Sequence, residues 1–154
     1  IVSMIEKNGL GYQLRTAIGE GKDRRTEKVI IMDTFGELFK VYSVATVVFC
    51  GGSLVPLGGQ NPMEPAAWGK AVLYGPYMDD FLDAKKLLEA ANATVPVGSG
   101  EELGEKAAWL FADKKARDEY GSRARRVVRD NCRTAEKHAG VIEKLLKETG
   151  NWTA

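Results

Sequence analysis

The chain has 154 residues, of which 44% are hydrophobic and 28% charged, and its formal net charge is +1. These values are typical of a globular protein with an apolar core, and the near-zero charge argues against a nucleic-acid partner or a general attraction to membranes. No apolar run approaches the ~20 residues of a membrane span. We therefore expect a single domain over residues 1–154.

The two cysteines, Cys50 and Cys132, match neither a metal-ligand spacing nor a disulfide framework, so we expect free thiols in a reducing compartment. The chain opens directly in a helical pattern without an initiator Met. We therefore expect it to be a piece of a longer protein.

Short apolar runs predict the strands. Tyr12 to Thr16 alternates like a short strand, and three later runs have the composition of buried strands: Val29–Met32, Thr46–Cys50 and Ala71–Tyr74. A last strand should run from Thr94 to Val97. The segment from Gly19 to Lys28 is polar and charged, which predicts a solvent loop.

Helical spacing separates these strands. The first helix should end at Asn8-Gly9, a second should turn Leu38, Phe39 and Tyr42 inward, and a third should run from Pro62 to Trp68. Asp79 or Asp80 should cap the helix that carries Phe81, Ala84, Leu87, Leu88 and Ala91.

A helical segment should begin at about residue 101 and reach Glu148 in three helices. Their inward side chains should be Leu103, Ala107, Leu110 and Phe111, then Tyr120, Ala124, Val127 and Val128, and then Val141, Ile142, Leu145 and Leu146.

Strands that alternate with helices predict an α/β fold, with a Rossmann-like parallel sheet that has helices on both faces. Ligands of such sheets bind beyond the carboxyl ends of the strands. The loops Asp33–Glu37, Gly51–Asn61 and Gly75–Asp80 leave those ends, so we expect a site where they meet.

The loop Cys50–Pro65, CGGSLVPLGGQNPMEP, combines two Gly-Gly pairs with three prolines. Asn61 and Glu64 fit a capping box around Pro62, which would make the segment a well-formed helix start. Free amide groups at the glycine pairs would also suit a phosphate or carboxylate. We favour an anion site over a plain connector, and leave open whether Glu64 caps the helix or accepts hydroxyl groups of a ribose.

The run from Asp33 to Phe81 resembles the carboxyl-terminal domain of 3-deoxy-D-manno-octulosonic acid (Kdo) transferases. The similarity is carried, in order, by DTFGEL, GGSL, GGQNPMEP and GPYMDDF. It continues more weakly through the helical tail.

The resemblance implies the C-terminal half of a GT-B glycosyltransferase, a domain that holds the donor CMP-Kdo. It places Gly51, Gly52 and Ser53 beside the donor, and Asn61 and Glu64 at its nucleotide. Further donor-binding residues are implied at Gly58, Gly59, Thr34, Gly36 and Glu37.

Three positions depart from the family pattern. Gln60 and Tyr77 each stand where His is usual, and Asp80 stands where Asn is usual. The catalytic base implied by the family is a Glu of the amino-terminal domain, so we expect no catalytic residue in this chain and no transfer activity from it alone.

Other candidate residues favour structural roles. His138 lies in a charged helical stretch, and Trp68 and Trp109 lie on apolar helix faces, so we expect a surface histidine and two core tryptophans. A solvated helix face is the preferred interpretation of the arginines at 123, 125, 126, 129 and 133, over a lipid-facing patch. Acid enrichment at a helix start accounts for Asp79, Asp80 and Asp83 better than a metal site does, and we expect no metal and no cofactor.

The hypothesis is therefore the donor-binding domain of an inverting Kdo transferase. By the resemblance, that enzyme moves Kdo from CMP-Kdo to the lipid A precursor in lipopolysaccharide biosynthesis, at the cytoplasmic face of the bacterial inner membrane. Contact with the acceptor and the membrane would come through the missing amino-terminal domain. Two alternatives remain: another GT-B enzyme such as an epimerase or UDP-sugar transferase, and a non-catalytic nucleotide-binding or interaction module.

Overall fold

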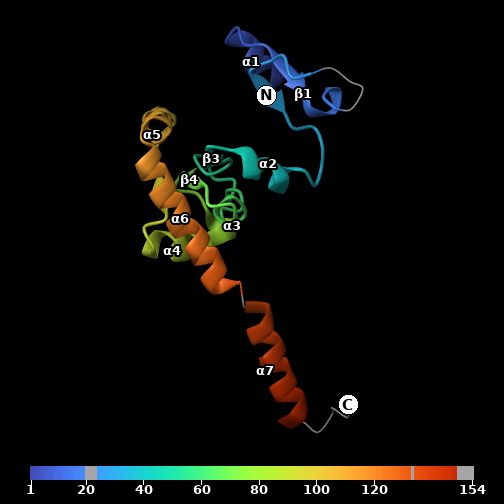
Figure 1. The fold of residues 1–154 in the computed structure, drawn as a ribbon, viewed down its shortest axis with the longest axis vertical. Helices are drawn as coiled ribbons and strands as arrows, with labels where there is room; N and C mark the ends of the chain where they lie inside the picture. The colour runs from blue at the N-terminus through green and yellow to red at the C-terminus, as the bar shows by residue number, and fades with distance from the viewer. Residues whose placement is uncertain (20–23, 133, 149–154) are drawn as a thin grey trace. The chain divides into compact units, whose positions relative to one another are not determined.

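The computed structural model describes residues 1–19, 24–132 and 134–148 (Figure 1). Side chains are described for the same residues except 134–138, so the expected surface position of His138 lies outside the described side chains, and that of Arg133 outside the described residues. The chain divides into two compact units, Ile1–Val41 and Tyr42–Ala154, and each is considered by itself.

The first unit holds a two-stranded parallel sheet. Its elements are α1 (Val2–Lys7), β1 (Tyr12–Leu14), a 3-10 turn η1 (Arg15–Ala17) and β2 (Val29–Ile31), followed by the start of α2 (Leu38–Val44). Gly9 has a φ of 67° and ends α1 as expected.

Three expectations for this part of the chain are wrong. The strand predicted from Tyr12 to Thr16 stops at Leu14 and gives way to η1. Strand β2 is half-buried rather than buried on both faces, and Leu38 and Phe39 are 43% and 46% exposed rather than turned inward.

The second unit holds a three-stranded parallel sheet in the order β3-β4-β5. Its elements are β3 (Val47–Cys50), α3 (Met63–Ala67), β4 (Ala71–Tyr74), η2 (Asp79–Phe81), α4 (Leu82–Ala90), β5 (Thr94–Pro96), α5 (Gly100–Ala112), α6 (Lys114–Asn131) and α7 (Thr134–Glu148). These strands lie within one residue of their predicted bounds. Strands β3 and β4 are continuous apolar runs, whereas β5 is the short segment Thr94-Val95-Pro96.

Helices cover both faces of this sheet. Ala71 and Leu73 of β4 pack on one face with Leu110 of α5, while Val72 and Tyr74 pack on the other face with Met78. A third cluster joins α3, α4 and α6 through Ala66, Leu88, Ala93, Ala124 and Val127. The predicted α/β architecture with a parallel sheet is therefore confirmed.

Helix α6 lies against α3 and β4 (Figure 1) because small residues let the backbones approach closely. Gly121 of α6 faces the carbonyl of Gly69, in the turn between α3 and β4, and a Cβ on Gly121 would overlap that oxygen. Gly69 itself has a φ of 68°. This glycine pair sets the distance between α6 and the sheet.

Several helical side chains differ from expectation. Asp79 and Asp80 lie in η2 and do not cap α4, which begins at Leu82. Phe111 is 61% exposed, and Val141, Ile142 and Leu145 of α7 are more than half exposed. The tryptophans are not core residues either: Trp68 is 41% and Trp109 37% exposed. A helical apolar stripe shows which residues share a face, but not what covers that face.

Candidate functional site

The loop after β3 is joined to the loop after β4 by Ser53. Its side chain is fully buried, and its hydroxyl donates a hydrogen bond to the Cys50 carbonyl (2.5 Å) and accepts one from the Gly75 amide (2.8 Å). The Tyr77 amide donates to the Ser53 carbonyl at 2.9 Å. Two of the three predicted loops are thus brought together in the second unit.

The close contact between these two loops also requires glycine at position 75. A Cβ at this position would overlap the backbone carbonyl of Ser53. Pro76 and Tyr77 continue the loop at the surface. Gly75 and Ser53 therefore form one packing unit at the carboxyl ends of neighbouring strands.

The second glycine pair of the loop also packs against the protein. Gly58 and Gly59 have φ values of 78° and 81°. A Cβ on Gly58 would overlap the carboxylate of Asp80, and one on Gly59 would lie 2.5 Å from Sδ of Met78. Close packing against Asp80 and Met78 therefore explains both glycines without a ligand, as expected if this part of the loop is a plain connector.

The first glycine pair differs. Gly51 has no atom within 4 Å of the position a Cβ would occupy, and Gly52 has only ordinary contacts there, at 3.6 Å or more. Gly52 has a φ of 70°, which a side chain would strain. Around Gly51, close approach of a ligand to the backbone is sterically open.

Asn61 and Glu64 form one hydrogen-bonded pair. The Asn61 Oδ1 accepts from the Met63 amide at 3.0 Å, and its Nδ2 donates to Glu64 Oε1 at 3.3 Å. Asn61 thus caps the chain entering α3, as expected. The alternative left open for Glu64, closing the capping box by accepting from the Asn61 backbone amide, is not seen among the described residues; the Asn61 side-chain amide donates to Glu64 instead.

This arrangement leaves part of the Glu64 carboxylate available. Its Oε2 accepts no hydrogen bond from any residue that the structure describes, and the side chain is half-buried. Helix α3 has only five residues, so its dipole adds little to the site. The carboxylate and the loop amides are therefore the groups able to bind a polar ligand here.

Two neighbours of Glu64 were not expected from the sequence. Burial, and secondly the Glu64 charge, raise the pKa of the Cys50 thiol to about 12. Burial also raises the pKa of Tyr42, with smaller contributions from Cys50 and Glu64. The Glu64 charge thus acts on the pKa of both groups, an electrostatic coupling that no spacing in the sequence indicates.

The segment Asp33–Glu37 belongs to the first unit, where Glu37 is held by two partners. Thr34 Oγ1 donates to Glu37 Oε2 at 2.6 Å, and Arg15 Nη2 donates to Glu37 Oε1 at 2.9 Å. These contacts lower the pKa of Glu37, the Thr34 hydrogen bond most and the Arg15 charge next. Gly36, with a φ of 79°, lets the chain turn between them.

Asp33 is hydrogen-bonded to η1 in a similar way. It accepts hydrogen bonds from the Thr16 hydroxyl (2.5 Å) and the Thr16 amide (3.0 Å), which lower its pKa. Phe35 is fully exposed at the tip of the segment. Arg15 and Thr16 were absent from the predicted site because their partners lie 17 to 22 residues further along the chain.

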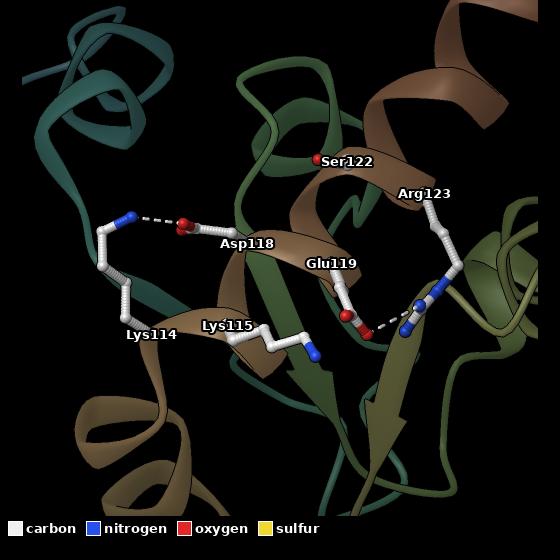
Figure 2. Close-up of a pocket in the computed structure, with 6 residues that line it drawn as sticks. All are labelled: Lys114, Lys115, Asp118, Glu119, Ser122 and Arg123. Carbon is white, nitrogen blue, oxygen red and sulfur yellow. Dashed lines mark hydrogen bonds and ion pairs between the residues drawn. The ribbon is translucent and has the colours of Figure 1, made fainter.

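A hollow of about 610 Å³ lies on the surface of α6 (Figure 2). Figure 2 shows two ion pairs within the helix, Lys114 with Asp118 and Glu119 with Arg123, and Lys115 beside them. The Arg123 guanidinium also lies 4.5 Å over the Tyr120 ring, and its Nε donates to the Asn92 carbonyl at 2.6 Å. None of the predicted site residues lines this hollow, and four of its five charged side chains are paired with one another.

The described part of the chain holds no cluster of three or more His, Cys, Asp and Glu side chains suited to a metal ion. Across those same residues, no helix is long and apolar enough to cross a bilayer. The fold and the loops after β3 and β4 define the class: a parallel α/β domain with a polar site at the carboxyl end of its sheet.

Comparisons with known proteins specify the family. The chain is 35% identical to a 3-deoxy-D-manno-octulosonic acid transferase of Aquifex aeolicus over 112 residues, 73% of this chain and 31% of that protein. It is 32% identical to the enzyme of the same name from Bordetella pertussis over 150 residues, 97% of this chain and 33% of that protein. No protein-family model matches the chain.

A solved structure has the same fold. The C-terminal CMP-Kdo binding domain of WaaA from Acinetobacter baumannii superposes with a TM-score of 0.74 at 23% identity, covering 82% of this chain and 65% of that one. The chain belongs to the 3-deoxy-D-manno-octulosonic acid (Kdo) transferase family. It spans about a third of the length of the curated relatives it matches.

Proposed function

We propose that this chain is the donor-binding domain of a Kdo transferase and that it binds CMP-Kdo. The observation that carries the proposal is the loop between β3 and α3, which has an open backbone at Gly51 and an available carboxylate oxygen at Glu64. Family membership and a fold shared with the CMP-Kdo binding domain of WaaA support this ligand class.

In this proposal the first glycine pair binds the phosphate. Loop amide groups near Gly51 and Gly52 donate hydrogen bonds to the phosphate oxygens, where a side chain would be in the way. Ser53 contributes by fixing the loop, since its own hydroxyl is used by Cys50 and Gly75. Gly58 and Gly59 likewise contribute indirectly, by packing against Asp80 and Met78 in the segment that follows β4.

Glu64 is the ribose ligand. A carboxylate accepts hydrogen bonds from two neighbouring hydroxyl groups, and Oε2 is the oxygen available for them. Asn61 orients this carboxylate through its amide and fixes the start of α3. The family resemblance alone supports Thr34, Gly36 and Glu37 as donor-binding residues, and within the first unit Thr34 and Glu37 hold the shape of their segment.

The whole enzyme then transfers Kdo to the lipid A precursor at the cytoplasmic face of the bacterial inner membrane. The acceptor and the catalytic base belong to another domain, so this chain alone binds donor without catalysing transfer. Its part in the reaction is to orient the donor and stabilise charge on the departing CMP phosphate with backbone amides.

Isothermal titration calorimetry tests this proposal. CMP should bind in the millimolar range, corresponding to about −4 kcal/mol, and more tightly than UDP. Glu64→Ala should weaken binding about tenfold, the loss of one charge-assisted contact. Asp118→Ala, on the distant α6, should leave it unchanged. Preference for UDP would favour another GT-B enzyme, and no binding of either nucleotide would favour an interaction module.

A further inference from the structure

The loop that follows β3 holds apolar side chains in solvent at its tip, Val55-Pro56-Leu57. Val55 is 49% and Leu57 72% exposed, and Pro56 between them is exposed as well. Leu54, immediately before the tip, packs against the core instead. The backbone therefore turns away from the core at Val55 and carries three apolar residues outward.

The conformation of the tip is a tight turn. The Leu57 amide donates a hydrogen bond to the Val55 carbonyl at 2.7 Å, which closes a γ-turn around Pro56. The pyrrolidine ring of Pro56 restricts φ to values near those that an inverse γ-turn requires. The leucine side chain is thus presented on a stiff piece of backbone.

Both ends of the tip are anchored within the second unit. Before it, the buried Ser53 hydroxyl is bonded to the Cys50 carbonyl and the Gly75 amide. After it, the Gly58 carbonyl accepts a hydrogen bond from the Asp80 amide at 3.2 Å. A surface that is fixed before binding loses little conformational entropy when a ligand packs on it.

Leu57 lies beside the first glycine pair. Its Cβ is 3.6 Å from the position that a Cβ on Gly52 would occupy, while the corresponding position at Gly51 is open. The donor phosphate assigned to these two glycines would therefore have the leucine as a neighbour. An apolar side chain next to a phosphate site must contact a group bonded to that phosphate.

The chemistry of the donor identifies this group. The phosphate of CMP-Kdo joins the ribose, which is assigned to Glu64, to the sugar that is transferred. That sugar is a 3-deoxy-octulosonic acid, linked through its anomeric carbon C2. The neighbouring carbon, C3, is a methylene group where most sugars carry a hydroxyl. It is the apolar part of the transferred sugar that lies next to the phosphate.

We propose that Leu57 is a specificity-determining residue of the donor site and that its side chain packs against the C3 methylene group of the transferred sugar. This inference rests on the proposed function, because it takes the phosphate at Gly51 and Gly52 and the ribose at Glu64. A sugar with a hydroxyl at C3 would bury that hydroxyl against the leucine without a hydrogen-bond partner, at a cost in affinity. The tip thus favours 3-deoxy sugars.

Affinities for CMP and CMP-Kdo, measured side by side by NMR titration, test the proposal. Leu57→Ala should weaken CMP-Kdo roughly fivefold, the loss expected for part of a buried leucine, and change CMP by less than about twofold. Leu57→Met keeps an apolar side chain of similar volume and should restore most of the affinity. Leu87→Ala, which removes a partly exposed leucine of α4, is the matched control and should affect neither ligand.

Magnetisation transfer provides a readout that a purely structural role would not change. Saturation of the leucine methyl groups should transfer to the C3 protons of CMP-Kdo more strongly than to its ribose protons. This transfer should be lost in Leu57→Ala and kept in Leu87→Ala. Thermal unfolding of each variant shows that it is folded at the temperature of the titration.

The contrary results separate this inference from the proposed function. Equal weakening of CMP and CMP-Kdo in Leu57→Ala would place the leucine beside the nucleoside and overturn the inference. Unchanged affinity for both ligands would overturn it too, while donor binding itself would stand. If the unaltered chain bound neither ligand, the proposed function would fail and this inference with it.

Discussion

The Ser53 hydroxyl accepts a hydrogen bond from the Gly75 amide at 2.8 Å, joining the loops that leave the carboxyl ends of β3 and β4. It also donates to the Cys50 carbonyl at 2.5 Å, and the side chain is fully buried. The position of the candidate donor loop therefore depends on one buried hydroxyl group, and water has no access to take over its two hydrogen bonds.

Replacement of Ser53 by alanine should destabilise the second unit by about 1–3 kcal/mol, because it leaves the buried Gly75 amide without its acceptor. Urea denaturation followed by circular dichroism measures the loss. Ser122→Ala on the exposed surface of α6 is the matched control and should change the free energy of unfolding little. Equal stability of the two variants would contradict the role given to Ser53.

Alanine at Gly121 should be destabilising by roughly 1–3 kcal/mol or more, since its Cβ would overlap the Gly69 carbonyl and push α6 away from α3. Gly104→Ala provides the opposite control. Gly104 lies within α5 and has open space around its Cβ position, so alanine there should stabilise by up to about 1 kcal/mol. Thermal unfolding of both variants should show shifts of opposite sign.

The first unit should lose stability in acid. The pKa of Glu37 is lowered by the Thr34 hydroxyl first and by Arg15 next, so folding favours the charged carboxylate. The resulting stabilisation is fully present above the ordinary glutamate pKa and is lost as pH falls through the lowered folded pKa.

NMR titration of the Glu37 carboxyl group in Thr34→Val should therefore show its pKa moving back up toward the ordinary value. Asp118 is an internal control, because its lowered pKa depends on Lys114 rather than on Thr34. An unchanged Glu37 pKa in the variant would show that the hydroxyl has no such role.

The two thiols should react very differently. Cys50 is buried and its pKa is raised to about 12, whereas the Cys132 side chain is exposed. At pH 8, iodoacetamide should modify Cys132 in the folded chain and leave Cys50 intact, while both should react in urea. Mass spectrometry of tryptic peptides locates the adducts. Rapid labelling of Cys50 in the folded chain would mean that β3 is far more open than described.

The sequence predicts the strands of the second unit well, because apolar runs such as Ala71–Tyr74 are bounded by breaks such as Lys70 and Gly75. It does not predict which apolar helical residues are covered. Phe39 and Phe111 have the right spacing for a core but lie at the surface. Spacing defines a face, and tertiary packing decides whether that face is buried.

In the candidate site, too, the sequence predicts the local features but not those that depend on tertiary packing. The sequence motif correctly predicts that Asn61 caps this helix start, where its side chain accepts from the Met63 amide, since capping is local. The glycines need the tertiary structure: Gly58 and Gly59 adjoin Asp80 and Met78, whereas Gly51 faces open space. A glycine pattern alone does not distinguish close approach of a ligand from close approach of another loop.

The most direct test of donor binding is the chemical-shift map of the 154-residue chain titrated with CMP. Donor binding at this loop predicts saturable shifts that centre on Gly51, Gly52 and Glu64, with smaller shifts in the loop after β4 through the Ser53–Gly75 hydrogen bond. The hollow on α6 should show none. Shifts centred on α6, or no shifts at about 10 mM CMP, a concentration that would detect even millimolar affinity, would contradict it.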